Sequence, residues 1–229
     1  MKVGILGTGG VGRALAEGFV REGHDVLVGT RDVDELMARS EPDRMGTPPF
    51  AQWLAEHPRV AVGAFSHVGE HAELLVNATL GSASVDVLRE AGLADAPGRI
   101  VIDASNALDH SGGFPPSLFV VNTDSLAEQI QREFPDARVV KAWNTMTASL
   151  MTNPGLLAGG DHSIPICGND DDARRQVADL LRSFGWRDVV DLGGIRAARG
   201  MEMYITLWLG LMGGLGSPMF NVRVVRAEG

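Results

Sequence analysis

Short apolar segments alternate with helical patterns along this 229-residue chain, and no other feature constrains its fold as strongly. Such alternation is typical of a parallel sheet covered by helices. Several segments are continuous apolar runs, as expected where both faces of a sheet are buried. The predicted strands span residues 2–7, 25–29, 59–64, 73–79, 99–104, 137–142, 163–168 and 188–192.

Two of the intervening helices have clear signatures. In residues 124–135 an apolar residue recurs at every fourth position, and Ser125 and Glu128 have the spacing of a capping box. Residues 169–185 carry a second apolar stripe and end at Gly185, a residue suited to a helix C-terminus. These patterns predict helices on the faces of the sheet.

The turn after the first predicted strand reads GTGGVG and opens a helical pattern. In this context Gly7 permits a tight turn, Gly9 lets the backbone approach a pyrophosphate, and Gly12 lets the helix pack closely on the strand. The helix N-terminus offers unpaired N–H groups and partial positive charge to phosphates. The motif therefore predicts a dinucleotide-binding site.

The second predicted strand ends at Thr30 and Arg31, where sites specific for NAD carry an acidic residue that binds the ribose 2′-hydroxyl. A guanidinium can instead pair with a 2′-phosphate and stack on adenine. Hydrogen bonds to charged groups contribute about 1.5–3 kcal/mol, which is about ten- to a hundredfold in affinity. We therefore expect the cofactor to be NADP(H).

Charge and composition argue against several partners and locations. A net charge of −9 disfavours nucleic acid as a partner. The single cysteine, Cys167, is expected to be a buried thiol in a reducing compartment, and no signal peptide is expected before the first strand, so we predict a cytoplasmic protein.

Residues 203–222 carry no charge, but their four glycines and a proline favour a buried or subunit-facing helix over a membrane span. His67 and His71 have H-x-x-E-H spacing, but a glycine interrupts the motif and no metal site is expected.

With these motifs, the chain resembles the F420-dependent NADP oxidoreductase family and the reductase domains of the STEAP metalloreductases. The resemblance also rests on VVKAWNT (139–145), IPICGNDDDA (164–173) and DLGGIRAARGMEM (191–203). It implies an NADPH-dependent oxidoreductase that transfers hydride between NADP(H) and a small redox substrate, either a deazaflavin (coenzyme F420) or a flavin. Two alternatives are an NADPH-dependent reductase of a small carbonyl or imine, which would need a proton donor, and a non-catalytic NADPH-binding sensor.

The resemblance also assigns site residues by position. Lys141 and Thr145 are the candidate catalytic residues, at the floor where nicotinamide meets the second substrate, and Lys141 could stabilise charge developing on a reduced ring. The alternative for Lys141 is an exposed lysine at a strand end. The expected cofactor-binding residues are Gly7, Thr8, Gly9, Gly10, Val11, Gly12, Thr30, Arg31, Asn77, Ala78, Thr79, Leu80, Ser105, Asn106, Ala107 and Ala142.

The expected architecture is an α/β, Rossmann-like doubly wound fold with a mainly parallel sheet and a C-terminal helical extension. Residues 1–145 are expected to form the NADP-binding domain, and residues 146–229 to extend the sheet. The segment 195–215 predicts a helix that is apolar nearly all round and therefore buried on most sides, so we expect it to form a homodimer. Alternatively, Met203 and Trp208 of this helix line the second-substrate pocket.

Overall fold

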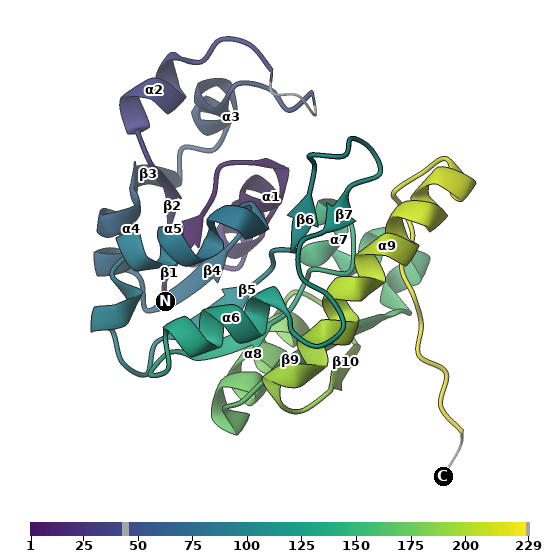
Figure 1. The fold of residues 1–229 in the computed structure, drawn as a ribbon. Helices are drawn as coiled ribbons and strands as arrows, with labels where there is room; N and C mark the ends of the chain where they lie inside the picture. The colour runs from purple at the N-terminus through teal and green to yellow at the C-terminus, as the bar shows by residue number, and fades with distance from the viewer. Residues whose placement is uncertain (43–45, 228–229) are drawn as a thin grey trace.

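An eight-stranded sheet lies at the centre of the molecule, with strand order β10-β9-β8-β5-β4-β1-β2-β3 (Figure 1). The computed structural model describes residues 1–42 and 46–227. Every predicted strand is present, with its ends within two residues of those expected. The strands are β1 (Lys2–Leu6), β2 (Asp25–Thr30), β3 (Val60–Ala64), β4 (Leu74–Asn77), β5 (Ile100–Asp103), β8 (Arg138–Lys141), β9 (Ser163–Gly168) and β10 (Asp188–Asp191), with a separate two-stranded hairpin of β6 (Leu108–Asp109) and β7 (Ser117–Leu118).

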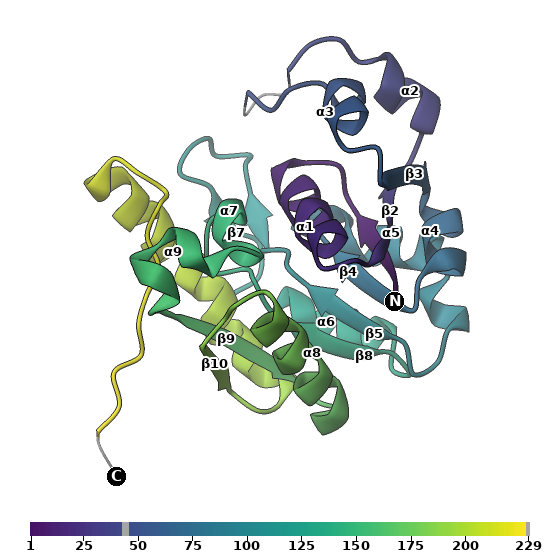
Figure 2. The same ribbon diagram turned by 180° about the vertical axis from the view of Figure 1, so that it is seen from behind.

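Helices cover both faces of this sheet. Figure 1 shows α4, α5, α6 and α9 in front of it, and Figure 2 shows α1, α7 and α8 on the opposite face. Helices α2 and α3 lie beyond the β2–β3 edge. The helices are α1 (Gly10–Arg21), α2 (Val33–Ala38), α3 (Phe50–Glu56), α4 (Phe65–His71), α5 (Ser84–Glu90), α6 (Leu126–Glu133), α7 (Ala148–Met151), α8 (Asp171–Ser183) and α9 (Ala198–Leu215).

The expected α/β fold with a mainly parallel sheet is confirmed. Strands β1 to β5 and β8 are parallel to one another, whereas β9 is antiparallel to β8. A parallel strand would require a connection that returns the chain to the amino edge of the sheet. The β8–β9 connection contains no long helix that could do so, and β9 therefore starts at the edge where β8 ends. The sheet therefore runs without interruption across residue 145, the expected domain boundary.

Two hydrophobic cores lie on the two faces of the sheet, because successive side chains of a strand point to opposite faces. The core beneath α1, α7 and α8 includes Trp143 and Trp186. The core beneath α4, α5 and α6 includes Leu75 and Val101, and the start of α9 at Met201 belongs to it.

The C-terminal helix is buried along only part of its length within one subunit. Its buried residues are Ala198, Met201, Glu202 and Ile205, spaced as one helical face, whereas Leu207 and Leu215 are 57% and 61% exposed. Within one chain the helix is therefore buried along one face, and the expectation that a partner subunit covers the rest stays a prediction. In the part of the chain that the structure describes, none of the helices has the length and apolar character needed to span a bilayer.

Candidate cofactor and active site

Five neighbouring parallel strands bring their carboxyl ends to one edge of the sheet. Their pairing aligns Leu6, Asn77, Asp103 and Lys141, the last residues of β1, β4, β5 and β8, and Thr30 ends β2 one residue further on. Ligands of open α/β sheets bind at this edge. Nearly all expected site residues lie at these strand ends or in the turns that follow them.

The glycine turn between β1 and α1 requires glycine at two positions. Gly7 has φ of +121°, and a Cβ atom there would lie 2.5 Å from the carbonyl oxygen of Ala78. A Cβ atom on Gly12 would lie 2.0 Å from the carbonyl oxygen of Gly7. These two glycines let α1 begin in close contact with β1 and β4.

Gly9 and Gly10 are different, because the protein itself has no need for glycine there. Nothing lies within 4 Å of a Cβ atom built on either residue, and Gly9 has an ordinary φ of −74°. The N-terminus of α1 has no side-chain cap and no acidic residue in its first turn. Open space and uncapped N–H groups at a helix N-terminus fit a pyrophosphate.

Arg31 is exposed and, within residues 1–42 and 46–227, has no hydrogen bond or ion pair. The nearby acidic groups have local partners. Asp32 caps α2 by accepting a hydrogen bond from the backbone N–H of Glu35 at 2.8 Å, and the Glu35 carboxylate pairs with Arg39. Arg31 is therefore available to pair with a 2′-phosphate at the end of β2.

Arg13 is a cation beside the glycine turn that the sequence analysis missed. It is 8% exposed, donates hydrogen bonds to the carbonyl oxygens of Thr8 (3.0 Å) and Pro48 (2.7 Å), and lies over the rings of Phe50 and Trp53. Arg13 thus links the glycine turn to the segment before α3.

At the ends of β4 and β5 a polar network replaces the apolar core. The Asp103 Oδ1 atom accepts hydrogen bonds from Asn77 Nδ2 (2.8 Å) and from Ser105 Oγ (2.6 Å). Asn77 Nδ2 also donates to Ser84 Oγ at 2.9 Å, while its Oδ1 accepts from Thr79 Oγ1 at 2.7 Å. These bonds fix the turns that leave both strands.

Lys141 completes the network from β8. Its Nζ lies 2.7 Å from Asp103 Oδ2, 2.6 Å from the Ser105 carbonyl oxygen and 2.9 Å from Glu202 Oε1. Burial lowers the pKa of the ammonium, but the attraction of the Asp103 and Glu202 carboxylates outweighs it and raises the pKa above its ordinary value. The alternative of an exposed strand-end lysine is wrong, because the Lys141 side chain is fully buried.

The segment after β8 reverses direction at Trp143, which has φ of +64° although it is not a glycine. Asn144 then exchanges two hydrogen bonds with Asn106 and donates to the carbonyl oxygen of Met201 at 2.9 Å. The Thr145 hydroxyl is buried and has no partner among the described residues. A positive φ at a residue other than glycine, as at Trp143, is a form of backbone strain that is found at functional sites.

The expected site residues divide into two groups by exposure. Those with exposed or partly exposed side chains or backbone are Gly7, Thr8, Gly9, Gly10, Val11, Thr30, Arg31, Ala78, Thr79, Leu80 and Asn106. Those that are buried are Gly12, Asn77, Ser105, Ala107, Lys141, Ala142 and Thr145. Members of the second group therefore shape the site more than they line it.

Glu202 and Ser84 were missed by the sequence analysis. A signal for Glu202 was present, since a carboxylate on an otherwise apolar helix requires a buried partner. Asp103 and Lys141 are direct partners in the β5–β8 register and signal the same cluster.

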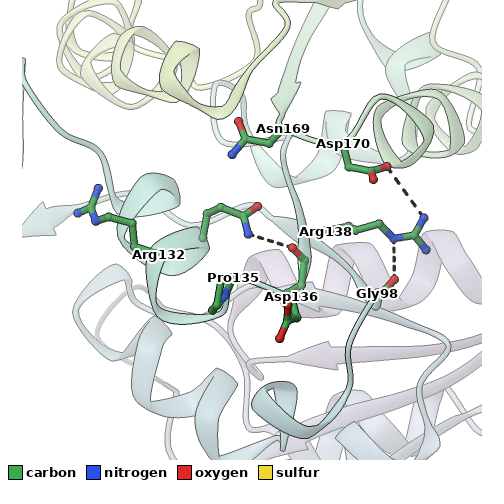
Figure 3. A pocket seen from close by; sticks show the side chains of 9 residues that line it. Gly98, Arg132, Pro135, Asp136, Arg138, Asn169 and Asp170 are labelled. Atoms are coloured by element: carbon green, nitrogen blue, oxygen red, sulfur yellow. Dashed lines mark hydrogen bonds and ion pairs between the residues drawn. The ribbon is translucent and has the colours of Figure 1, made fainter.

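Another hollow lies away from this edge of the sheet (Figure 3). It has a volume of about 760 Å³ and includes Arg138, which begins β8, so it lies at the amino edge of the parallel strands. Arg138 donates to the carbonyl oxygen of Gly98 at 2.6 Å and lies 4.0 Å from Asp170. Because this hollow lies at the edge of the sheet opposite to the glycine turn, we do not assign it to the active site.

Cys167 is fully buried in β9, as expected, and burial raises the pKa of its thiol to about 12. The residues that the structure describes contain no group of three or more His, Cys, Asp or Glu arranged to hold a metal ion.

Comparison with known proteins assigns the chain to a family. The family described as NADP oxidoreductase, coenzyme F420-dependent, matches residues 2–107. A solved structure described as a candidate F420-dependent NADP reductase from Arthrobacter sp. FB24 is 52% identical, with 99% of this chain and 100% of that chain covered and a TM-score of 0.94. The chain belongs to the F420-dependent NADP oxidoreductase family. Membership confirms both the expected Rossmann-like fold and the expectation of an NADP-dependent oxidoreductase.

Two further relatives of this chain differ in length. The F420-dependent NADP reductase of Methanothermobacter marburgensis is 27% identical over 220 residues, which cover 92% of each chain. The metalloreductase STEAP3 of Rattus norvegicus is 29% identical over 203 residues, which are 88% of this chain but 36% of that protein. The chain therefore spans little more than a third of the STEAP relatives that it matches.

Proposed function

We propose that this protein transfers hydride between NADP(H) and a deazaflavin of the coenzyme F420 type. The observation that carries the proposal is the similarity to the F420-dependent NADP reductase of M. marburgensis, which extends over 92% of both chains. The Arthrobacter structure gives further support through its 52% identity.

The residues at the carboxyl edge of the sheet fit the cofactor. The N–H groups at the start of α1, beside Gly9 and Gly10, would bind the pyrophosphate, and Thr30 and Arg31 would bind the 2′-phosphate. The turns at residues 78–80 and 105–107 would border the ribose and the nicotinamide. When bound, NADPH supplies the hydride, while the protein supplies orientation and excludes water.

Lys141 has a different role in this proposal from the catalytic one expected. Its ammonium is fully buried and contacts three oxygen atoms, of Asp103, Ser105 and Glu202, so we assign it to positioning the loops rather than to contact with a ring. Thr145, whose buried hydroxyl has no partner among the described residues, remains the candidate for contact with the second substrate.

The polar groups at the site favour a ring acceptor over a small carbonyl or imine. Reduction of a carbonyl or imine needs a proton donor beside the carbon that accepts hydride. Burial raises the pKa of Tyr204, the sole tyrosine, which makes it a weaker acid. Tyr204 and Thr145 line a hollow of about 210 Å³ whose other residues are mainly apolar. Hydride transfer between two rings depends more on their alignment and on the exclusion of water than on a side-chain acid.

We also propose that α9 joins two subunits and that residues 146–229 supply both this helix and part of the second-substrate pocket. The support is the exposure of Leu207 and Leu215 on the outer half of α9, since exposed apolar surface marks interaction sites. A flavin as acceptor and a cytoplasmic location stay predictions.

The test is to mix the purified protein with NADPH and either oxidised coenzyme F420 or FMN, and to follow the loss of NADPH absorbance. Turnover with F420 alone supports the proposal. Turnover with FMN alone would reassign the protein as a flavin reductase. Tight NADPH binding without turnover of either acceptor would contradict the proposed activity and favour a cofactor-binding sensor.

A further inference from the structure

A continuous path of buried polar contacts connects the C-terminal helix to the turns at the carboxyl edge. It runs from Glu202 through Lys141 and Asp103 to Asn77 and Thr79. Glu202, Lys141, Asp103 and Asn77 are each at most 1% exposed. Because each buried polar group is held in place by its hydrogen-bond partners, a substitution at one end of the path is expected to shift the groups at the other end.

Glu202 joins three elements at the start of this path. Its Oε2 accepts a hydrogen bond from the backbone N–H of Leu126 at 2.8 Å, and its Oε1 accepts from that of Ala127 at 3.0 Å. These are the first N–H groups of α6, which have no partner within the helix. The same Oε1 atom contacts Lys141 Nζ, so Glu202 of α9 holds both α6 and β8.

The far end of the path shapes the turns after β4 and β5. Asn77 holds the Thr79 backbone N–H at 3.3 Å as well as its hydroxyl, and Asp103 holds the Ser105 backbone N–H at 3.2 Å. Lys141 holds the Ser105 carbonyl oxygen from the other side. Within the described part of the chain, no hydrogen bond or ion pair joins Arg31 or residues 8–12 of the glycine turn to the Glu202, Lys141, Asp103 and Asn77 side chains. The network therefore acts on one half of the cofactor site.

From this arrangement we infer that Glu202 is a positioning residue for the nicotinamide half of the cofactor. The inference rests on the proposed function, which places the nicotinamide at the turns after β4 and β5. Glu202 acts through Lys141 and Asp103 and does not itself contact the cofactor. The 2′-phosphate half of the site is independent of it.

Glu128 offers a matched control. It lies in the first turn of α6 and forms a two-pronged ion pair with Arg199 of α9, at 2.7 and 2.8 Å. This pair ties the same two helices together but has no contact with Lys141. Glu128→Gln therefore loosens the α6–α9 contact and leaves the buried path intact.

The experiment measures binding of two probes to the wild type, E202Q and E128Q. One probe is NADPH, and the other is 2′,5′-ADP, which has the adenosine and 2′-phosphate but no nicotinamide. A Gln at position 202 keeps the shape but loses the charge and one acceptor. We expect E202Q to weaken NADPH binding about tenfold and to change 2′,5′-ADP binding by less than about twofold, with neither changed in E128Q.

Several results would overturn the inference. One is that E202Q weakens binding of NADPH and of 2′,5′-ADP equally. Another is that E128Q loses as much NADPH affinity as E202Q, and a third is that E202Q binds NADPH as tightly as the wild type. If E202Q does not fold, Glu202→Asp replaces it, because the shorter side chain keeps the charge but withdraws the carboxylate from Lys141. E202D must then show the same selective loss of NADPH binding. Because the measurement needs no acceptor, absence of F420 turnover contradicts the proposed function alone, whereas a wild type that binds neither probe overturns both.

Discussion

The two halves of the proposed cofactor site are built in opposite ways. At the 2′-phosphate half, the protein presents backbone N–H groups, open space at Gly9 and Gly10, and the exposed side chain of Arg31. At the nicotinamide half, it presents turns whose shape is fixed from beneath by a buried network centred on Asp103 and Lys141. The first half depends on residues close together in sequence, and the second on contacts among four distant segments.

This difference follows from what each half has to do. A phosphate is recognised by charge and by N–H donors, which a helix N-terminus and one arginine supply without help from the rest of the chain. Hydride transfer depends on the position of a ring, and position requires a rigid support. The polar network supplies that support by tying α9, β8 and β5 to the turns that would face the nicotinamide.

The largest effect is expected from Lys141→Met, which breaks the support. It leaves the Asp103 and Glu202 carboxylates buried without their cation, and removal of one partner of a buried pair costs about 3–5 kcal/mol. Chemical denaturation measures the loss in the free energy of unfolding. Lys2→Met is the control, since an exposed lysine is expected to contribute within about 0.5 kcal/mol. Equal effects of the two variants would show that the network does not support the fold.

The same pair of variants predicts a dependence on pH. The pKa of Lys141 is raised in the folded protein above its ordinary value of 10.5. A raised pKa stabilises the folded state fully below the ordinary value, and the stabilisation is lost as pH rises through the folded value. The difference in unfolding free energy between the wild type and K141M should therefore stay constant from pH 7 to about 10 and shrink above that range.

The glycine turn allows stability and binding to be separated. Gly12→Ala places a Cβ atom 2.0 Å from the Gly7 carbonyl oxygen and should cost about 1–3 kcal/mol or more of stability. Gly9→Ala meets no protein atom within 4 Å, so its unfolding midpoint should stay within a few degrees of wild type. NADPH affinity of G9A should nevertheless fall at least about tenfold, because the methyl group occupies the approach to the pyrophosphate. Unchanged affinity in a folded G9A protein would place the phosphates elsewhere.

Sequence reasoning predicted much of the fold, and it identified the glycine turn and Arg31 as the residues of the proposed 2′-phosphate half. The strands followed from apolar runs, and the glycine turn and Arg31 follow from local order along the chain. The Ser125 cap was also predicted, and its hydroxyl accepts the backbone N–H of Glu128 at 3.2 Å. The roles of Lys141 and Glu202 were not reached, because they depend on segments far apart in sequence that pack on one face of the sheet. The reversal of β9 was missed for a different reason, because it depends on the absence of a long helix between β8 and β9.

Arg31→Ala is expected to act on binding without affecting stability. Arg31 is exposed and unpaired in the part of the chain described, so its removal disturbs no internal contact. Loss of a charged hydrogen bond to the 2′-phosphate corresponds to about 1.5–3 kcal/mol, and the preference for NADPH over NADH should fall about ten- to a hundredfold. Dissociation constants for both nucleotides measure the ratio, with Arg39→Ala as a nearby control whose partner is Glu35. A ratio that does not change in R31A would remove Arg31 from the cofactor site.

The smallest effect on stability is expected at Thr145, which is an exception within the buried half. Thr145 and Thr152 are each 4% exposed, but the Thr152 hydroxyl donates to the carbonyl oxygen of Ala14 at 3.3 Å, whereas that of Thr145 has no partner among the described residues. Replacing a partnered hydroxyl by a methyl group costs about 0.5–1.5 kcal/mol, and replacing an unpartnered one is neutral or stabilising. Thr152→Val should therefore lower the unfolding free energy, and Thr145→Val should not. Since a buried hydroxyl without a partner is costly to keep, a loss of turnover in a T145V protein of full stability would assign that hydroxyl to the second substrate, and unchanged turnover would remove Thr145 from the active site.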